Sequence, residues 1–531
     1  MEAQFLTPVA RPQIVADALT ITCDPEDRCG RMSLLIRDGR IADIASDSTA
    51  LRVEHDDVEV FDAHGFLVVP AFANAHFHPE SLLFEDIVRS VPYGLWKLDP
   101  VFQKRMERIM DASFLESLKT VYTVSAMHHL RAGVLTVGHI VPPLTLDELV
   151  PFLDQERALH LRVRTVLRTW EQIAHGKELK STGNHIAVSI GEDTDYTVYS
   201  LDNLARSAHD LDVPICLHLG ELKEEAEILR RNFKKGLLTI LQDAKLLHPS
   251  TQIAHLNHGS PDDLKIVADA QMILSVCPSS AALKRTGYPL LRHLEQYRVP
   301  LCFGTDWGSG DLLDEMRFMQ GLPFLFSNLP EYSSLELLKM ATVHGAKALG
   351  FGEHTGSIER GKQADLVFFS LQPFHMEYVR ENPSADDLAR LVLARMHSSD
   401  IAQVMASGRT VFEQGRCLGI DEAAIVSQFR DLFVSLPGAA KRVEWESSRA
   451  TIIPFMTPVP SKVTPEDGYE EGFTIMRPST PVAAPASPSP TSVKSITPPE
   501  PTPPQPERKI HKPELSKNVR LNFGDDDDGS A

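Results

Sequence analysis

The sequence predicts an α/β fold built on a (β/α)8 TIM-like barrel, joined to a small composite β-sandwich and a disordered C-terminal tail. Three observations support this. Short apolar runs alternate with helical patterns in the middle of the chain, strand-and-turn patterns flank them on both sides, and the chain ends in a proline-rich segment. The 531 residues accordingly divide into 1–66 (N-terminal part of the sandwich), 67–355 (barrel), 356–453 (C-terminal part of the sandwich and a closing helix) and 454–531 (tail).

The N-terminal segment reads as short strands separated by turns. Asp38–Arg40, the sequence DGR, lies between two apolar runs and predicts a hairpin, because glycine allows the tight turn. The segment 13–63 is too small to bury both faces of a sheet alone. Residues 356–420 show the same strand-and-glycine pattern, so the two ends are expected to assemble one β-sandwich around the inserted middle.

The middle of the chain contains eight candidate strands separated by helical stretches, which fits a closed barrel. An open doubly wound sheet is the competing architecture, but no GxGxxG pattern opens the first helix. The candidate strands are 66–70, 133–140, 161–167, 185–191, 213–219, 251–256, 272–278 and 299–306.

The last segment, 454–531, holds 16 of the 37 prolines and many serines and threonines. Such a composition buries too little apolar surface to offset the entropy of ordering, so the segment is expected to be disordered. It is either a passive tail or a ligand for a protein partner.

Composition places the chain among soluble cytoplasmic proteins. The net charge of −19 argues against nucleic acid as a partner, since phosphate binding needs a basic face. The six cysteines form no CxxC pair, as expected in a reducing cytoplasm. Neither a secretory signal pattern nor an apolar run of membrane-spanning length is found, so no membrane contact is expected.

Two histidines, His76 and His78, follow the first apolar run of the barrel. Alternate residues of a strand point to the same face, so both imidazoles are expected on one side at the strand's end. Two imidazoles held in this way can chelate a divalent metal ion. A pair of ordinary surface histidines is the alternative.

The other candidate strands also end in chemically capable side chains. Because the active site of such a barrel lies at the C-terminal ends of its strands, these side chains are expected to meet there. Three imidazoles and a carboxylate suit zinc, iron or manganese, which favours the metal site. The strand ends carry His139, His218 with Glu221 behind it, His255 with His258 behind it, and Asp306.

These residues lie in segments that resemble the amidohydrolase superfamily, in its guanine-deaminase-like and triazine-hydrolase-like branch. The resemblance spans about residues 15–420 and excludes the tail. It rests on AFANAHFHPE (71–80), VPICLHLGELKEE (213–225), IAHLNH (253–258) with SVCPSSAAL (275–283), FGTDWGSGD (303–311) and ATVHGAKALGFGEHTGSIERGKQADLVFF (341–369).

The resemblance implies a mononuclear site. His76, His78, His218 and Asp306 match the family's four metal ligands. The expected cofactor is therefore one divalent metal ion, zinc in preference to iron, although imidazole and carboxylate accept both. Glu221 matches the family's proton-shuttling glutamate, and His255 matches the histidine that polarises the substrate or positions the water.

The chemistry of these side chains agrees with the implied roles. A divalent metal lowers the pKa of bound water from about 15.7 towards 7, so a metal-bound hydroxide can form at neutral pH. Asp306 can accept the water's proton, Glu221 can protonate the ring nitrogen and the leaving amine, and His255 can stabilise the developing charge. Each has a structural alternative: Glu221 as a first-turn acid of the next helix, Asp306 as a helix cap, and His258 in place of His255.

Other residues have weaker patterns. Trp96 resembles the family's loop over the substrate, where its ring could stack on a planar heterocycle, but a core position is equally consistent. His139 could line the pocket or be a core histidine. Lys284 and Arg285 follow the seventh strand, where a solvated pair is expected in preference to contact with an anionic substrate.

The sequence therefore predicts a cytoplasmic metal-dependent hydrolase acting on carbon–nitrogen bonds other than peptide bonds, most simply by deaminating a nitrogen heterocycle. Hydrolysis of a cyclic amide or of another leaving group at the same site is the alternative within the enzyme class. A catalytically silent binding or scaffold protein that works through its tail is the alternative outside it. The expected partner is a small heterocyclic substrate. A homodimer is expected only by family resemblance.

Overall fold

The computed structural model describes residues 11–54, 58–88, 93–109, 111, 114–142, 144–191, 196–289, 291–325, 331–377 and 379–438. These residues belong to one unit defined by their mutual contacts. The predicted disordered tail at 454–531 lies outside the described residues.

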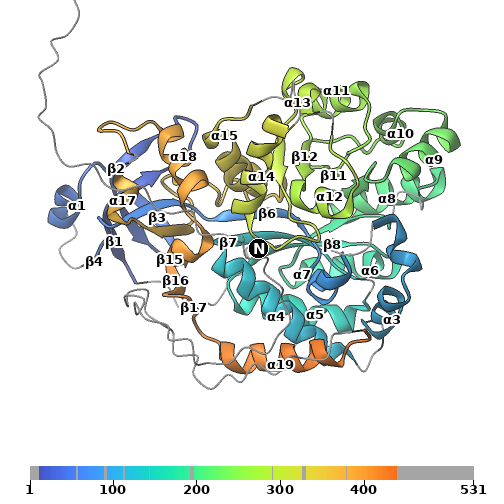
Figure 1. Ribbon diagram of the computed structural model, residues 1–531, viewed down its shortest axis with the longest axis horizontal. Coiled ribbons are helices and arrows are strands. Elements are labelled where there is room, and N and C mark those ends of the chain that lie inside the picture. The colour runs from blue at the N-terminus through green and yellow to red at the C-terminus, as the bar shows by residue number, and fades with distance from the viewer. Residues whose placement is uncertain are drawn as a thin grey trace, which may run out of the picture. The chain divides into compact units, whose positions relative to one another are not determined.

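Parallel strands in the middle of the chain form a TIM-barrel-type fold (Figure 1). They lie in two four-stranded sheets, β6-β7-β8-β9 and β10-β11-β12-β13. Parallel bridges from Phe77 to Asp306 and from Val188 to Ile215 join the sheets at both edges, which closes the ring. The strands are β6 (Phe72–Phe77), β7 (Val134–Ile140), β8 (Arg162–Leu167), β9 (His185–Val188), β10 (Cys216–Leu219), β11 (Gln252–His255), β12 (Ile273–Val276) and β13 (Leu301–Phe303).

Helices follow the barrel strands and cover the outside of the ring. After β6 come η1 (Pro79–Leu83), α2 (Glu85–Val88), η2 (Tyr93–Leu98), α3 (Pro100–Ile109) and α4 (Leu115–Arg131). The next strands are followed by α5 (Leu146–Ala158), α6 (Trp170–Ala174), α7 (Gly176–Ser181), α8 (Val198–Leu211), α9 (Lys223–Phe233), α10 (Leu237–Asp243) and α11 (Pro261–Asp269). The last are α12 (Pro278–Lys284), α13 (Leu291–Gln296), α14 (Leu312–Leu325), α15 (Ser334–Lys339), the π-helix η5 (Met340–His344) and α16 (Gly345–Ala348).

Both ends of the chain contribute strands to one mixed sheet with the order β17-β16-β15-β14-β5-β1-β2-β3 and with β4 beside β1. The sequence predicted a composite sandwich from both chain ends. Both ends do supply its strands, which are hydrogen-bonded continuously, since β5 pairs with β14 on one side and with β1 on the other. The strands are β1 (Gln13–Ile21), β2 (Cys29–Arg37), β3 (Arg40–Ala45), β4 (Glu59–Asp62), β5 (Phe66–Pro70), β14 (Leu366–Ser370), β15 (Ile401–Ala406), β16 (Arg409–Glu413) and β17 (Arg416–Cys417).

The assignment of residues 66–70 to the barrel was wrong. This apolar run forms β5 of the mixed sheet, and β6 is the first barrel strand. A strand buried on both faces has the same apolar pattern in either sheet, so its pairing partner, β14, decides its place. The other seven barrel strands lie where the sequence predicted them.

The hairpin predicted at DGR connects β2 to β3. Arg37 pairs with Arg40, which leaves Asp38 and Gly39 as a two-residue turn. Both have positive φ, 51° and 74°, as a type I′ turn requires. Glycine is needed at position 39, because an added Cβ would lie 2.8 Å from the Ser407 carbonyl oxygen.

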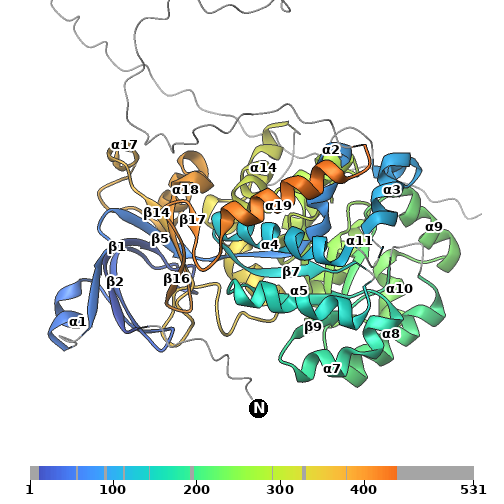
Figure 2. The same ribbon diagram turned by 90° about the horizontal axis from the view of Figure 1, so that it is seen from below.

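Apolar side chains join the mixed sheet to the barrel. Val69, Val134 and Val367 belong to one buried cluster. The remaining helices are α1 (Ser48–Glu54), α17 (Pro373–Met376), η6 (Ser398–Asp400), α18 (Ala385–Arg395) and α19 (Glu422–Ser435). Figure 2 shows α19 lying along α4, where Arg131 binds Glu422 at 2.8 Å.

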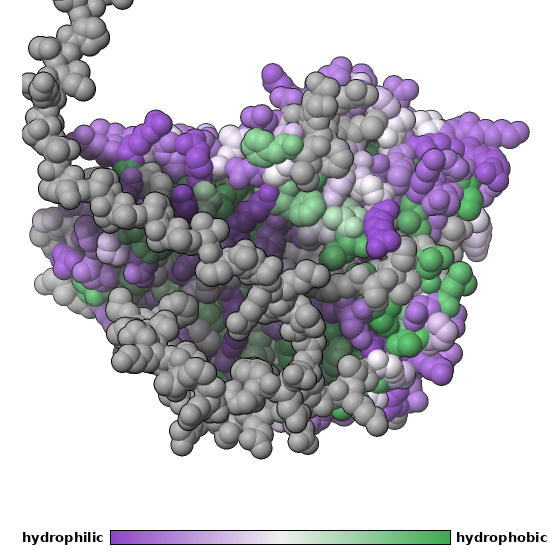
Figure 3. Space-filling view, in the orientation of Figure 1, coloured by the Kyte–Doolittle hydropathy of each residue, from purple (hydrophilic) through white to green (hydrophobic). Residues whose placement is uncertain are grey.

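The surface over α9 and α10 is largely hydrophilic (Figure 3). It includes the acidic first turn of α9, with Glu224 and Glu225. Within the described residues, no helix has both the length and the apolar content that a membrane crossing requires.

Candidate metal centre

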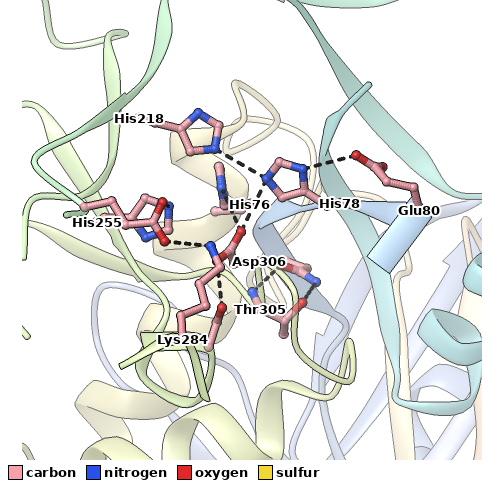
Figure 4. A network of polar contacts seen from close by, with 12 residues as sticks. His76, His78, Glu80, His218, His255, Lys284, Thr305 and Asp306 are labelled. Atoms are coloured by element: carbon pink, nitrogen blue, oxygen red, sulfur yellow. Dashed lines mark hydrogen bonds and ion pairs between the residues drawn. The ribbon is translucent and has the colours of Figure 1, made fainter. Parts of the chain in front are cut away.

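Histidines and one aspartate converge at the C-terminal ends of four barrel strands (Figure 4). His76 lies in β6 and His78 directly follows that strand, His218 lies in β10, His255 ends β11, and Asp306 follows β13. All five side chains are buried. The structure thus brings together the residues that the sequence had singled out as metal ligands, with His255 beside them.

Backbone pairing fixes Asp306 next to the paired histidines. The Asp306 amide donates to the His76 carbonyl at 2.8 Å, and the His78 amide donates to the Asp306 carbonyl at 3.3 Å. Asp306 and His255 both have positive φ, 51° and 74°, a conformation that costs energy for residues other than glycine. Both residues lie at this end of the barrel, in one group of donor atoms with His76.

The potential ligand atoms form two overlapping groups, each with its atoms within 4.8 Å of one another: His76, His78 and His218, and His76, His255 and Asp306. The Nε2 atoms of His218 and His78 are 3.4 Å apart. Asp306 Oδ1 lies 3.3 Å from His78 Nε2 and 3.6 Å from His76 Nε2. One divalent ion could be held between them.

The protonation states suit a metal ion. Burial lowers the pKa of His76 to about 4 and brings the pKa values of His218 and His255 well below their usual range, so these imidazoles are neutral at pH 7. Burial alone would raise the pKa of Asp306, but the Lys284 ammonium and the neighbouring histidines hold it well below its usual range. The cluster therefore offers neutral imidazoles and an ionised carboxylate.

Several polar atoms of the cluster are buried without a partner. Among the described residues, His76 Nε2, His255 Nε2 and Asp306 Oδ1 accept or donate no hydrogen bond. An orphaned buried polar atom costs about 1–3 kcal/mol. Three such atoms facing one another fit the donor set of a divalent metal ion.

Glu80 supports His78 from behind. Its Oε1 lies 3.5 Å from His78 Nδ1, on the side of the ring opposite the cluster. A carboxylate in this place fixes the orientation of a ligating imidazole and increases its basicity. Sequence analysis missed Glu80, although its position two residues after His78 was a usable signal.

Glu221 lies beside His255, with its Oε2 3.7 Å from His255 Nε2. It precedes the N-cap of α9, so the first-turn acids of that helix are Glu224 and Glu225. Asp306 likewise lies outside α14. The start of that helix is capped by Asp311, whose Oδ1 accepts a hydrogen bond from the Leu313 amide. The structural alternatives for Glu221 and Asp306 therefore do not apply.

The expectation of a solvated Lys284 was wrong. Lys284 is only 2% exposed, and its Nζ lies 2.6 Å from Glu221 Oε1 and 2.5 Å from Asp306 Oδ2. Arg285, the next residue, is exposed as expected. A lysine is buried at this depth only when carboxylates pair with it, and these partners are distant in sequence.

Aromatic rings border the cluster on the side of His78. The rings of Trp307 and His78 are 5.5 Å apart, and those of Trp96 and Trp307 are 5.0 Å apart. Trp96 is buried and belongs to an apolar cluster with Phe84. The structure thus places Trp96 next to the site and within its aromatic wall.

His139 and His258 lie apart from this arrangement. His139 is buried at the end of β7, with its Nδ1 3.1 Å from Glu156 Oε1 on α5 and its ring 5.0 Å from that of Tyr122. His258 Nε2 lies 2.7 Å from the Thr286 carbonyl oxygen. Of the two histidines behind β11, His255 is the one in the cluster.

Comparisons with known proteins find relatives of similar sequence and solved structures of the same fold. A 5-methylthioadenosine/S-adenosylhomocysteine deaminase of Pyrococcus horikoshii is 26% identical over 391 residues, which cover 70% of this chain and 89% of the relative. The crystal structure of a zinc-bound adenosine deaminase of Xanthomonas campestris superimposes with a TM-score of 0.69 at 20% identity, covering 80% of this chain and 99% of that one. A zinc complex of atrazine chlorohydrolase from Arthrobacter aurescens gives a TM-score of 0.68 at 19% identity, covering 79% and 100%.

The sequence model of the amidohydrolase family matches residues 67–411, more than half of the chain. This match spans the barrel, the histidine cluster and the return of the chain into the mixed sheet. The protein belongs to the amidohydrolase family.

Proposed function

We propose that the protein is a metal-dependent aminohydrolase that replaces an amino group of a nitrogen heterocycle with oxygen and releases ammonia. The observation that carries this proposal is the buried convergence of neutral imidazoles and one ionised carboxylate at the strand ends, with Glu221 beside them. Deaminase relatives and a zinc-bound deaminase of the same fold support it.

The proposed ligands are His76, His78, His218 and Asp306, holding one ion, with zinc preferred to iron. Zinc is bound in the crystal structures of two fold neighbours, which supports that choice. When bound, a divalent metal lowers the pKa of water and so supplies a nucleophile at neutral pH. His255 lies beside these four residues, as a member of the donor group that it forms with His76 and Asp306, and would be left to contact the substrate.

The chain's own residues would then move the protons. Asp306 accepts a proton from the attacking water, and protonated Glu221 gives its proton to the ring nitrogen. As the C–N bond breaks, the proton held by Asp306 passes by way of Glu221 to the leaving amine, and the proton of the new hydroxyl group returns Glu221 to its starting state. His255 donates a hydrogen bond to the atom on which negative charge develops. One water is consumed and one ammonia leaves, so the reaction needs no further co-reactant. Trp96 would border the planar ring of the substrate.

A second candidate reaction uses the same site on another leaving group. The atrazine chlorohydrolase among the fold neighbours favours it, because that name describes loss of chloride rather than of ammonia. Hydrolysis of a cyclic amide at the same site is a further reaction within this alternative. The nature of the leaving group would then depend on the substrate pocket and not on the metal centre.

The division of the chain predicted from the sequence belongs to this proposal. With the first boundary moved past β5, residues 71–355 would carry the catalysis, 1–70 and 356–453 would frame the barrel, and 454–531 would serve another purpose. A cytoplasmic location is supported by six free thiols, five of them buried, because free cysteines persist in reducing compartments.

The test is a screen of planar heterocyclic substrates with the full-length protein. Aminated purines, purine nucleosides, pyrimidines and triazines would be assayed for ammonia, and chlorinated triazines and cyclic amides for chloride and ring opening. Ammonia release from one aminated class supports the proposal. Turnover confined to chlorinated or cyclic amide substrates would replace it with the second candidate.

Gly304 offers a steric test of the proposed ligand His76. It directly follows β13, and an added Cβ would lie 2.6 Å from His76 Cβ and 2.9 Å from the His76 carbonyl oxygen. Gly304→Ala should displace His76 and weaken metal affinity roughly 10- to 100-fold, the usual effect of disturbing a ligand's orientation. Competition with a chelator measures this affinity.

Gly321→Ala is the matched control, because nothing lies within 4 Å of the added Cβ and the position is helical. It should leave the affinity unchanged. Equal affinities for Gly304→Ala and the wild type would contradict the role assigned to His76.

A further inference from the structure

Lys284 occupies an unusual place for a lysine. It is the last residue of α12, and α12 is anchored at its start by the Ser279 amide, which donates to Glu315 Oε2 of α14 at 2.9 Å. The side chain runs from the end of α12 into the metal centre, where only 2% of the residue remains exposed (Figure 4).

The ammonium bridges the two carboxylates of the centre. Its Nζ lies 2.6 Å from Glu221 Oε1 and 2.5 Å from Asp306 Oδ2. Ser280 Oγ, from the same helix, donates to the same Asp306 oxygen at 2.7 Å. The short helix α12 thus holds one oxygen of each carboxylate.

The second oxygen of each carboxylate faces the imidazoles. Asp306 Oδ1 lies 3.3 Å from His78 Nε2, and Glu221 Oε2 lies 3.7 Å from His255 Nε2. Each carboxylate therefore contacts the Lys284 ammonium through one oxygen. Its other oxygen is directed towards the place where metal and substrate would meet.

The two carboxylates favour the charged form of Lys284. Burial lowers the pKa of an ammonium, but the charges of Asp306 and Glu221 outweigh this effect and raise the pKa of Lys284 above its usual value. Trp96 covers the ammonium, with Nζ 6.0 Å from the centroid of its ring. Lys284 is therefore charged at neutral pH.

We propose that Lys284 is a positioning residue of the reaction, which holds the Glu221 and Asp306 carboxylates in the orientation that directs Oε2 and Oδ1 to the reacting centre. This inference rests on the proposed function for what Glu221 and Asp306 do, and on the contacts of Lys284 for how they are held. Without the ammonium, two buried carboxylates would repel each other and rotate towards other donors.

Lys284→Met tests this proposal, because methionine fills similar volume without charge or donors. The variant should lose kcat by about 100-fold, as expected when a catalytic group is displaced by about 1 Å, with a much smaller change in KM. Arg285→Met is the matched control: it removes one positive charge from the neighbouring, exposed residue and should keep the wild-type kcat.

A double-mutant cycle separates positioning from general damage. In a Glu221→Gln background the carboxylate that Lys284 orients is gone, so adding Lys284→Met should cost less than about tenfold in kcat. An equal loss in both backgrounds would show that Lys284 acts independently of Glu221 and would overturn the part of the proposal that concerns Glu221; the part that concerns Asp306 is tested by the cobalt spectra.

Cobalt spectra give a readout that needs no turnover. In protein loaded with Co²⁺, Lys284→Met should shift the visible absorption bands because Asp306 reorients, whereas Arg285→Met should not. Unchanged bands together with wild-type kcat would overturn the proposal. Failure of the proposed function is distinct, since the wild type would then release no ammonia while the cobalt spectra still report on Asp306.

Lys284→Met leaves two buried carboxylates without their cation and risks unfolding the protein. Lys284→Gln is therefore the second variant, because its amide is shorter and still donates. Circular dichroism and thermal unfolding establish that it is folded. It should again lose kcat and shift the cobalt bands; a folded Lys284→Gln with wild-type values for both would contradict the proposal.

Discussion

His218→Ala is expected to remove both the bound metal and the ammonia-releasing activity. His218 Nε2 lies 3.4 Å from His78 Nε2, and alanine leaves three of the four proposed ligands, His76, His78 and Asp306. A site that loses one of four ligands no longer closes the tetrahedral set that zinc prefers. We expect bound metal to fall from about one ion per chain to below about one tenth, by elemental analysis of protein purified without chelators.

His209→Ala is the matched control for this variant. His209 lies on α8 with 89% of its side chain exposed, and its loss should change neither metal content nor activity. Thermal unfolding of both variants excludes a general loss of structure. A His218→Ala protein that keeps wild-type metal content would show that the ion is held elsewhere.

Glu221→Gln is expected to separate catalysis from metal binding. Glu221 is not among the atoms that form the two donor groups, so its amide analogue should keep the metal. Glutamine cannot carry a proton to the ring nitrogen and the leaving amine, so kcat should fall by about 10²- to 10⁴-fold, the range for loss of a general acid or base. Steady-state ammonia release with parallel metal analysis measures both quantities.

Glu224→Gln controls for the change of charge, because this exposed carboxylate lies in the first turn of α9, three residues further along. It should retain the wild-type kcat. If Glu221→Gln were equally active, the proton shuttle would have to be another residue. If it lost its metal, Glu221 would instead act on the centre through Lys284.

Much of the centre could be predicted because its geometry is local or follows from the barrel. The spacing of His76 and His78 places both imidazoles on one face of a strand. The other residues, His218, His255 and Asp306, end strands whose carboxyl ends meet at one edge of a parallel barrel. Neither step needed knowledge of long-range contacts beyond the fold class itself.

The errors arose where distant pairing decides the outcome. Residues 66–70 read as a barrel strand, but their partner β14 lies about 300 residues further along the chain. Lys284 read as a surface residue because its burial depends on Glu221, 63 residues away, and on Asp306 after the next strand. The sequence could not decide whether His139 lines the pocket or lies in the core for the same reason, since its partner is Glu156 on α5. Local sequence patterns do not indicate such long-range contacts.

The most direct test of the central claim is a zinc titration of metal-depleted protein, with ammonia release measured at each step on the best heterocyclic amine from the screen. We predict that activity is lost on depletion, rises in proportion to added zinc and levels off at about one ion per chain. Activity that survives complete depletion, or that levels off only at two ions per chain, would contradict a mononuclear metal-dependent aminohydrolase.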